Sequence, residues 1–116
     1  MNKYSDKSDF EINKEVVKLI KTKGGYSCVD HDEIVKVYVS QNTGIYKEFD
    51  PCNDPYDAMP IVIENRISIE SRFNGHYDEW YASLQTNKIL IDATGTNYYR
   101  VAMEVFLMMK DAENES

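Results

Sequence analysis

Apolar and polar positions follow two different periods along the chain, and the change of period predicts the elements. From Ile12 to Ile20 apolar residues recur at helical spacing, with lysines on the opposite face. Ser8 and Glu11 match the S-x-x-E capping box just before them. Gly24-Gly25 is typical of a helix end. The pattern therefore predicts a first helix over about 9–23.

The next stretch is rich in β-branched and aromatic residues. Segments 33–39 and 45–49 have strand composition, and the turn residues of segment 41–44 lie between them. We therefore expect a hairpin. In one interpretation Cys28-Val29 begins an additional short strand, but Asp30-His31-Asp32 interrupts it.

All three prolines of the chain lie within residues 50–60. Asp54-Pro55 has the residue types of a helix start, with a capping side chain before a proline at the first helical position. Pro60 would delete a hydrogen bond inside a helix that began there. We therefore expect a turn first, followed by a second helix that Asp57 caps and that ends near Asn65.

Three strand-like segments and a final helix complete the pattern. The strand-like segments are 67–70, 80–84 and 89–91, separated by turn residues. The final helix is capped at Thr96 or Asn97 and runs to about Asp111. The order α-β-β-α-β-β-β-α predicts an α+β fold, in which three helices cover a small antiparallel sheet of four or five strands.

The final helix is apolar around its whole circumference. Eight of the nine residues from Val101 to Met109 are apolar, and Glu104 is the exception. Such a helix is typically buried on all sides, and we favour core packing. The alternative is a homodimer contact. The residues of that contact would be Met103, Phe106 and Met109.

Length and charge restrict the class of protein. A chain of 116 residues forms one domain, 1–116, in which we expect 1–7 and 112–116 to be frayed. The formal net charge of −7 disfavours a nucleic-acid binder, because affinity for duplexes comes mainly from cationic contacts to phosphate. No apolar run is long enough for a membrane span, and no secretory signal is visible. With two cysteines and no disulfide framework, we expect a cytoplasmic protein.

The charge is unevenly distributed along the chain. Residues 1–23 hold six lysines against four acids, whereas the remainder holds seven bases against 16 acids. A basic face on the first helix would suit a phosphate backbone or an acidic partner, although a solvated lysine face is the commoner explanation. Mimicry of nucleic acid by the acidic remainder would require its acids to gather on one side.

Candidate catalytic chemistry is sparse. Segments 30–32 and 76–79 each combine a histidine with acids, but neither has the spacing of a metal-binding helix motif. Cys52 precedes a helix start, which lowers a thiol pKa, but neighbouring aspartates oppose this, and we interpret it as a packed cysteine. No nucleophile elbow, phosphate loop or dinucleotide motif is present. We therefore expect no enzyme, no metal and no cofactor.

Aromatic and polar residues provide the binding candidates instead. Aromatic residues make up 12% of the chain, and tyrosine and tryptophan are favoured at binding hot spots. For the single tryptophan, Trp80, we favour a core position over a binding role. The candidate binding residues are Asp50, Asn53, Asp54, Asp57, Tyr77, Trp80, Tyr98 and Tyr99.

Three segments together resemble one phage family. SDFEINKEV, DPCNDPYDAMPIVIENRISI and NYYRVAMEVFLMMKDA occur in this order and span nearly the whole chain. They resemble the phage NinX family, small proteins of lambdoid phages and prophages that are grouped as a domain of unknown function. The resemblance implies a phage accessory protein that acts inside a bacterial cell. It implies no reaction and no catalytic residues.

Three functions from different classes remain open. The first is a non-enzymatic accessory protein that binds a host or phage protein. The second is a small hydrolase or nuclease-like enzyme that uses a divalent metal held by segment 30–32 or by His76, Asp78 and Glu79. The third is a weak single-strand binder that stacks bases on Tyr98 and Tyr99 beside the basic first helix.

Overall fold

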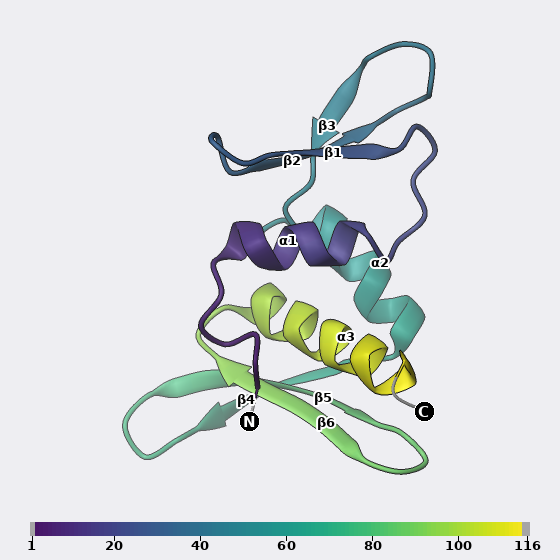
Figure 1. Ribbon diagram of the computed structural model, residues 1–116. Helices are drawn as coiled ribbons and strands as arrows, with labels where there is room; N and C mark the ends of the chain where they lie inside the picture. Colours follow the sequence, from purple (N-terminus) through teal and green to yellow (C-terminus); the bar gives the residue numbers. More distant parts are fainter. Residues whose placement is uncertain (1, 115–116) are drawn as a thin grey trace.

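The computed structural model describes residues 2–114 and shows four layers (Figure 1). In chain order the elements are α1 (Asp9–Val17), β1 (Tyr26–Val29), β2 (Ile34–Tyr38), β3 (Tyr46–Glu48), α2 (Pro55–Asn65), β4 (Ser68–Phe73), β5 (Asp78–Gln85), β6 (Leu90–Gly95) and α3 (Tyr98–Asn114). The sheet β1–β2–β3, called here the N-terminal sheet, lies on α1. Helices α1 and α2 lie on α3, and α3 covers the sheet β4–β5–β6, called the C-terminal sheet.

The expected α+β class is confirmed, with one difference in the sheets. All strand pairs are antiparallel, as predicted. However, the described residues form two sheets of three strands each rather than one sheet of four or five. Two separate sheets arise because α1 and α3 both lie between them, so that each sheet covers a different helix.

Helix α1 begins as predicted but ends earlier. The Ser8 hydroxyl accepts a hydrogen bond from the Glu11 N–H at 3.1 Å, and the Glu11 carboxylate accepts one from the Ser8 N–H at 3.2 Å. The helix ends at Val17, well before the expected end at residue 23. Gly24 lies instead against the end of the hairpin, where an added Cβ would be 2.6 Å from the Ser40 backbone. This glycine therefore allows a close backbone approach and does not end the helix.

The N-terminal sheet contains the predicted hairpin and one further strand. β2 pairs with β3, and the Cys28-Val29 segment belongs to β1, which pairs with the other side of β2. Val35 is the one fully buried residue among the three strands. Half-buried Val37 and Cys28 pack beside it against the core.

Helix α2 starts at the earlier of the two sites considered. The Asp54 side chain accepts a hydrogen bond from the Tyr56 N–H at 2.9 Å, and Pro55 is the first helical residue. The expectation that Asp57 caps a later helix is therefore wrong. Pro60 lies inside the helix and cannot donate to the carbonyl of Tyr56. Because Tyr56 is 86% exposed, water can satisfy that carbonyl.

The C-terminal sheet has one buried and one exposed face. Ala82, Ile91 and Ala93 alternate with polar residues and are at most 6% exposed. This face lies against α3, which also contacts α1 and α2 on its other side. This alternation fixes which side of each strand faces solvent.

Helix α3 is buried on both sides, as the core-packing interpretation requires. Asn97 caps it, because its Oδ1 accepts hydrogen bonds from the N–H groups of Tyr99 and Arg100. Met103, Phe106 and Met109 are 0%, 2% and 8% exposed. A second copy would have to open the fold to reach these side chains, so the structure does not support a dimer contact through them.

Both ends of the described part of the chain belong to the fold. Tyr4 is 6% exposed and belongs to the core. α3 continues to Asn114, so residues 112–114 are helical. Residues 1, 115 and 116 lie outside the described part.

Candidate functional site

β6 is an open edge of the C-terminal sheet. It is the outer strand beside β5 and contains no proline or lysine, the residues that commonly protect sheet edges. Its one charged residue, Asp92, lies on the exposed face, where its carboxylate accepts a hydrogen bond from the Tyr81 hydroxyl at 2.9 Å. The other outer strands differ: β1 and β3 have four and three residues, and β4 carries a Glu70–Arg72 ion pair.

The hairpin turn identifies which backbone groups of β6 point away from β5. The Thr86 N–H donates to the Ile89 carbonyl at 2.9 Å, so these two residues form a hydrogen-bonded pair. Because such pairs alternate with non-bonded pairs, the bonded residues of β6 are Ile91, Ala93 and Gly95. The residues between them point their N–H and C=O groups outward. These are Leu90, Asp92 and Thr94.

A cleft of about 700 Å³ runs along this edge. The inward side chains of Ile91 and Ala93 border it, and Met108 and Ala112 of α3 form its apolar floor. Residues Asn2, Lys3 and Ser5 line its opposite side. None of the backbone hydrogen bonds recorded for residues 2–114 joins this N-terminal segment to β6. The cleft therefore combines unpaired main-chain groups with an apolar floor.

Arg100 forms hydrogen bonds with the N-terminal segment that lines the cleft. Its guanidinium donates to the carbonyls of Tyr4 and Lys7 and to the carboxylates of Asp9 and Glu104. The Arg100 side chain is 15% exposed and the Glu104 side chain 6%, so this ion pair is largely removed from water. A partly buried charge network thus connects the N-terminal segment to α3 beside β6.

Two further contacts hold the same segment at the far end of the cleft. Asp111 accepts a hydrogen bond from the Tyr4 hydroxyl and forms an ion pair with Lys3 at 3.2 Å. Burial and the Asp111 carboxylate both raise the pKa of Tyr4. Tyr4 therefore remains a neutral hydrogen-bond donor at any physiological pH.

The predicted polar residues of segment 50–57 form a structural junction. Asp57 is 8% exposed, and its carboxylate accepts hydrogen bonds from Lys47 Nζ and from the Asp50 N–H. Asp50 in turn accepts hydrogen bonds from Asn13 and Asn53. These residues join β3, α1 and the start of α2. Their side chains bond one another, and Asp54 caps α2, so this cluster stabilises the fold.

Asp9 connects this junction to Arg100. Partial burial on its own would raise the pKa of Asp9, but hydrogen bonds from Arg100 and Asn53 outweigh it. The pKa of this carboxyl therefore lies below its usual value. The Asp9 main-chain carbonyl also accepts a weak hydrogen bond from the Cys52 thiol at 3.8 Å.

Cys52 is a packed residue, as expected. It is 0% exposed, and its N–H donates to Asn13 Oδ1 at 3.2 Å. Burial raises the pKa of the Cys52 thiol, and the nearby charge of Asp9 acts in the same direction. The thiol is therefore protonated at neutral pH and unsuited to nucleophilic attack.

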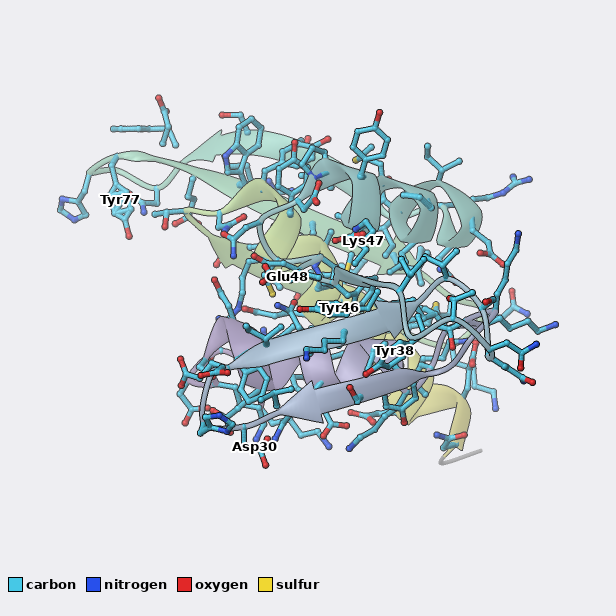
Figure 2. All side chains as sticks on the ribbon, turned by 90° about the horizontal axis from the view of Figure 1, so that it is seen from above. Asp30, Tyr38, Tyr46, Lys47, Glu48 and Tyr77 are labelled. Carbon is cyan, nitrogen blue, oxygen red and sulfur yellow. The ribbon has the colours of Figure 1, made fainter. Side chains whose placement is uncertain are left out.

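Three of the predicted aromatic residues come together and one does not. The ring centroids of Trp80 and Tyr98 are 4.9 Å apart, and those of Tyr98 and Tyr99 are 5.1 Å apart. All three are half-buried, and Trp80 and Tyr99 pack against the core. Tyr77 lies apart, near the tip of the β4–β5 hairpin (Figure 2). The basic residues Lys14 and Lys18 of the first-helix segment are paired with acids.

The two histidine clusters lie on different sheets. His31 is in the β1–β2 turn, where its Nε2 is 3.4 Å from Asp32, and His76 is in the β4–β5 turn. Among residues 2–114, no three His, Cys, Asp or Glu side chains converge in a way that would hold a metal ion. The structure therefore gives the metal-dependent alternative no assembled ligand set. No helix in the same range has the length and apolar content required to cross a bilayer.

The fold and the cleft together define a small, four-layered α+β domain with one open strand edge. The family model described as "Bacteriophage P22, NinX" matches residues 3–110. Because this match covers nearly the whole chain, the chain belongs to the phage NinX family, as the resemblance indicated. It is thus a phage accessory protein. None of the curated proteins matches it.

Proposed function

We propose that this chain is a non-enzymatic interaction module that binds an extended segment of a host or phage protein along β6. The observation that carries the proposal is the unpaired edge of β6 beside an apolar cleft. An incoming strand would continue the C-terminal sheet, because the outward main-chain groups of Leu90, Asp92 and Thr94 match those of an extended backbone. Such binding would take place in the cytoplasm of a bacterial cell.

The cleft also defines the side chains that the bound segment should carry. Successive side chains of a strand point to opposite faces, so every second residue of the segment would enter the cleft beside Ile91 and Ala93. The floor there is apolar, formed by Met108 and Ala112. The residues between would face solvent beside Asp92. We therefore expect a segment of about five residues in which apolar residues alternate with polar ones.

Selection from a random peptide library displayed on phage, with the purified chain as bait, tests this proposal. We expect the selected peptides to share the alternating pattern. Asp92→Pro removes one outward N–H from β6 and leaves the main-chain bonds to β5 in place, although it also removes the side-chain hydrogen bond from Tyr81. It should weaken binding about tenfold, since one hydrogen bond contributes about 1 kcal/mol and the ring obstructs the edge.

Ser71→Pro is the matched control. Ser71 belongs to β4, the opposite edge of the same sheet, and its N–H also points away from β5, because the Asn74–Tyr77 pair is bonded. This variant should bind the selected peptides like the unchanged protein. Equal losses in both variants, peptides that lack the alternating pattern, or a selection that enriches no peptide would each contradict the proposal.

A further inference from the structure

A second hollow lies on the other side of α3, between the N-terminal sheet and the helices. It consists of two adjoining cavities of about 500 and 360 Å³, which share Ile20, Lys21, Phe49 and Asp57 as lining residues. α2 contributes one side and β2 and β3 the other. We call it the lysine groove. Figure 2 shows Lys47 between β3 and α2, and this residue lines the smaller cavity.

The floor of the lysine groove is apolar. Phe49 and Ile61 are 7% and 6% exposed, and Phe106 of α3 lies beneath them at 2%. Half-buried Ile20 and Val37 continue the floor toward the sheet. A floor of this kind suits aliphatic or aromatic side chains of a ligand.

The rim of the lysine groove is basic, although the whole protein carries a net charge of −7. Four lysines line it against two acids, Asp57 and Glu64. Asp57 is nearly buried and already paired with Lys47. Lys21 and Lys23 are exposed and have no ion pair in the described part of the chain. Lys110, the fourth lysine, is paired with Glu113, and Glu64 has no ion pair among the described residues. Lys21 and Lys23 against Glu64 therefore leave the rim with a small net positive charge on an acidic molecule.

Large apolar side chains also lie exposed beside the basic rim. Tyr56 and Leu19 line one cavity and are 86% and 42% exposed, and Val39 lines the other at 57%. Exposed apolar residues next to charges mark interaction surfaces more often than isolated ones do. Tyrosine in particular is favoured at binding hot spots.

We propose that the lysine groove binds an acidic, amphipathic segment of a partner protein. The apolar side chains of that segment pack on Phe49 and Ile61, and its carboxylates pair with Lys21 and Lys23. Charge complementarity selects this partner: an acidic segment matches the rim, whereas a basic one would be repelled. A protein segment is favoured over nucleic acid because the floor residues Phe49, Ile61 and Phe106 are buried and do not form a platform of exposed rings.

The lysine groove is independent of the strand edge. It shares no lining residue with the β6 cleft, and Phe106 and Met108 point to opposite sides of α3. A chain with both sites would bridge two partners or two segments of one partner. Failure of one proposal would leave the other intact.

Fluorescence anisotropy with a labelled synthetic peptide tests the lysine groove. The probe is a 16-residue peptide with leucines at helical spacing and glutamates elsewhere. We expect saturable binding that weakens with rising salt. Lys23→Glu should weaken it about tenfold at low salt, whereas Lys88→Glu, which makes the same charge change in the exposed β5–β6 turn, should have little effect.

A second experiment separates the groove from general electrostatics. The same peptide with its sequence scrambled, so that the leucines no longer share one face, should bind at least tenfold more weakly. Equal binding of the scrambled peptide, equal loss in Lys88→Glu, or no binding by the original peptide would overturn the proposal. Tighter binding of a single-stranded oligothymidine, with the same dependence on Lys23, would overturn it in favour of nucleic acid.

Discussion

The two sheets of this protein have the same number of strands but very different surroundings. The C-terminal sheet buries one face against α3, with Ala82, Ile91 and Ala93 all at most 6% exposed. The N-terminal sheet buries one strand residue completely, Val35. The C-terminal sheet is therefore part of the main core, whereas the N-terminal sheet covers α1 and forms one side of a groove. We therefore expect the C-terminal sheet to contribute more to stability, and the N-terminal sheet to contribute more accessible surface.

The better-packed sheet is also the one whose edge offers more unpaired main-chain groups. The N-terminal sheet ends in strands of four and three residues, which offer few main-chain groups to a partner. The C-terminal sheet, although better packed, ends in the six-residue strand β6, in which Leu90, Asp92 and Thr94 point their main-chain groups outward. A well-anchored sheet with an open edge is a suitable acceptor for a further strand, because its edge is rigid before binding.

The largest expected effect concerns the segment that lines the β6 cleft. Arg100→Met should lower the free energy of unfolding by about 4 kcal/mol, since it leaves the buried Glu104 carboxylate without its cationic partner and with only the Asn2 side chain donating to it. Urea denaturation measures this. Adding Glu104→Gln should recover much of the loss. A double variant as unstable as the sum of the two single variants would show that the two charges do not depend on each other.

A second pair of substitutions compares the two sheets directly. Ile91→Ala in β6 of the C-terminal sheet should cost about 3 kcal/mol, because the side chain is 5% exposed and its loss leaves a cavity. Val35→Ala in the N-terminal sheet should cost less, about 1.5 kcal/mol, since it removes two methyl groups at the margin of the core. Equal costs in urea denaturation would show that both sheets belong equally to the core.

A smaller effect should appear in acid. The pKa of Asp9 lies below its usual value in the folded protein, so the unfolded state binds a proton more readily. The stability that Asp9 contributes is present above the pKa of the unfolded state and is lost as pH falls through the folded one. Asp9→Asn should therefore flatten the decline in Tm below about pH 4. An unchanged acid slope would contradict this assignment.

The smallest perturbation compares the two cysteines. Cys52 is buried with a raised thiol pKa, whereas Cys28 of β1 is half-buried. Iodoacetamide should therefore modify Cys28 first, and Cys52 only after unfolding, as followed by mass spectrometry. Rapid labelling of Cys52 in the native protein would mean that the junction around Asn13 opens easily.

Much of the fold could be predicted from local patterns. The capping box at Ser8, the Asn97 cap and the all-round apolar α3 each follow from short-range chemistry, and each is observed. The predictions failed where tertiary contacts decide. Gly24 resembles a helix end but allows close contact with Ser40, and Pro60 is tolerated inside α2 because Tyr56 is exposed.

The candidate site was much less predictable. The apolar run 89–91 predicts a strand, but nothing in it indicates that β6 lies at an edge, because strand order depends on pairing between distant segments. The residues that lie beside it, such as Asn2 and Lys3, were expected to be frayed. The polar residues around Asp57 are predicted binding candidates, and the sequence does not indicate that they bond one another in the fold.

Amide hydrogen exchange of β6 tests the central claim most directly. In the free protein the amides of Leu90, Asp92 and Thr94 should exchange rapidly, whereas those of Ile91 and Ala93 should be protected by β5. A peptide selected from the library should protect the first three amides. If bound peptide leaves them unprotected, or if they are already protected in the free protein, β6 is not the open edge that the proposed function requires.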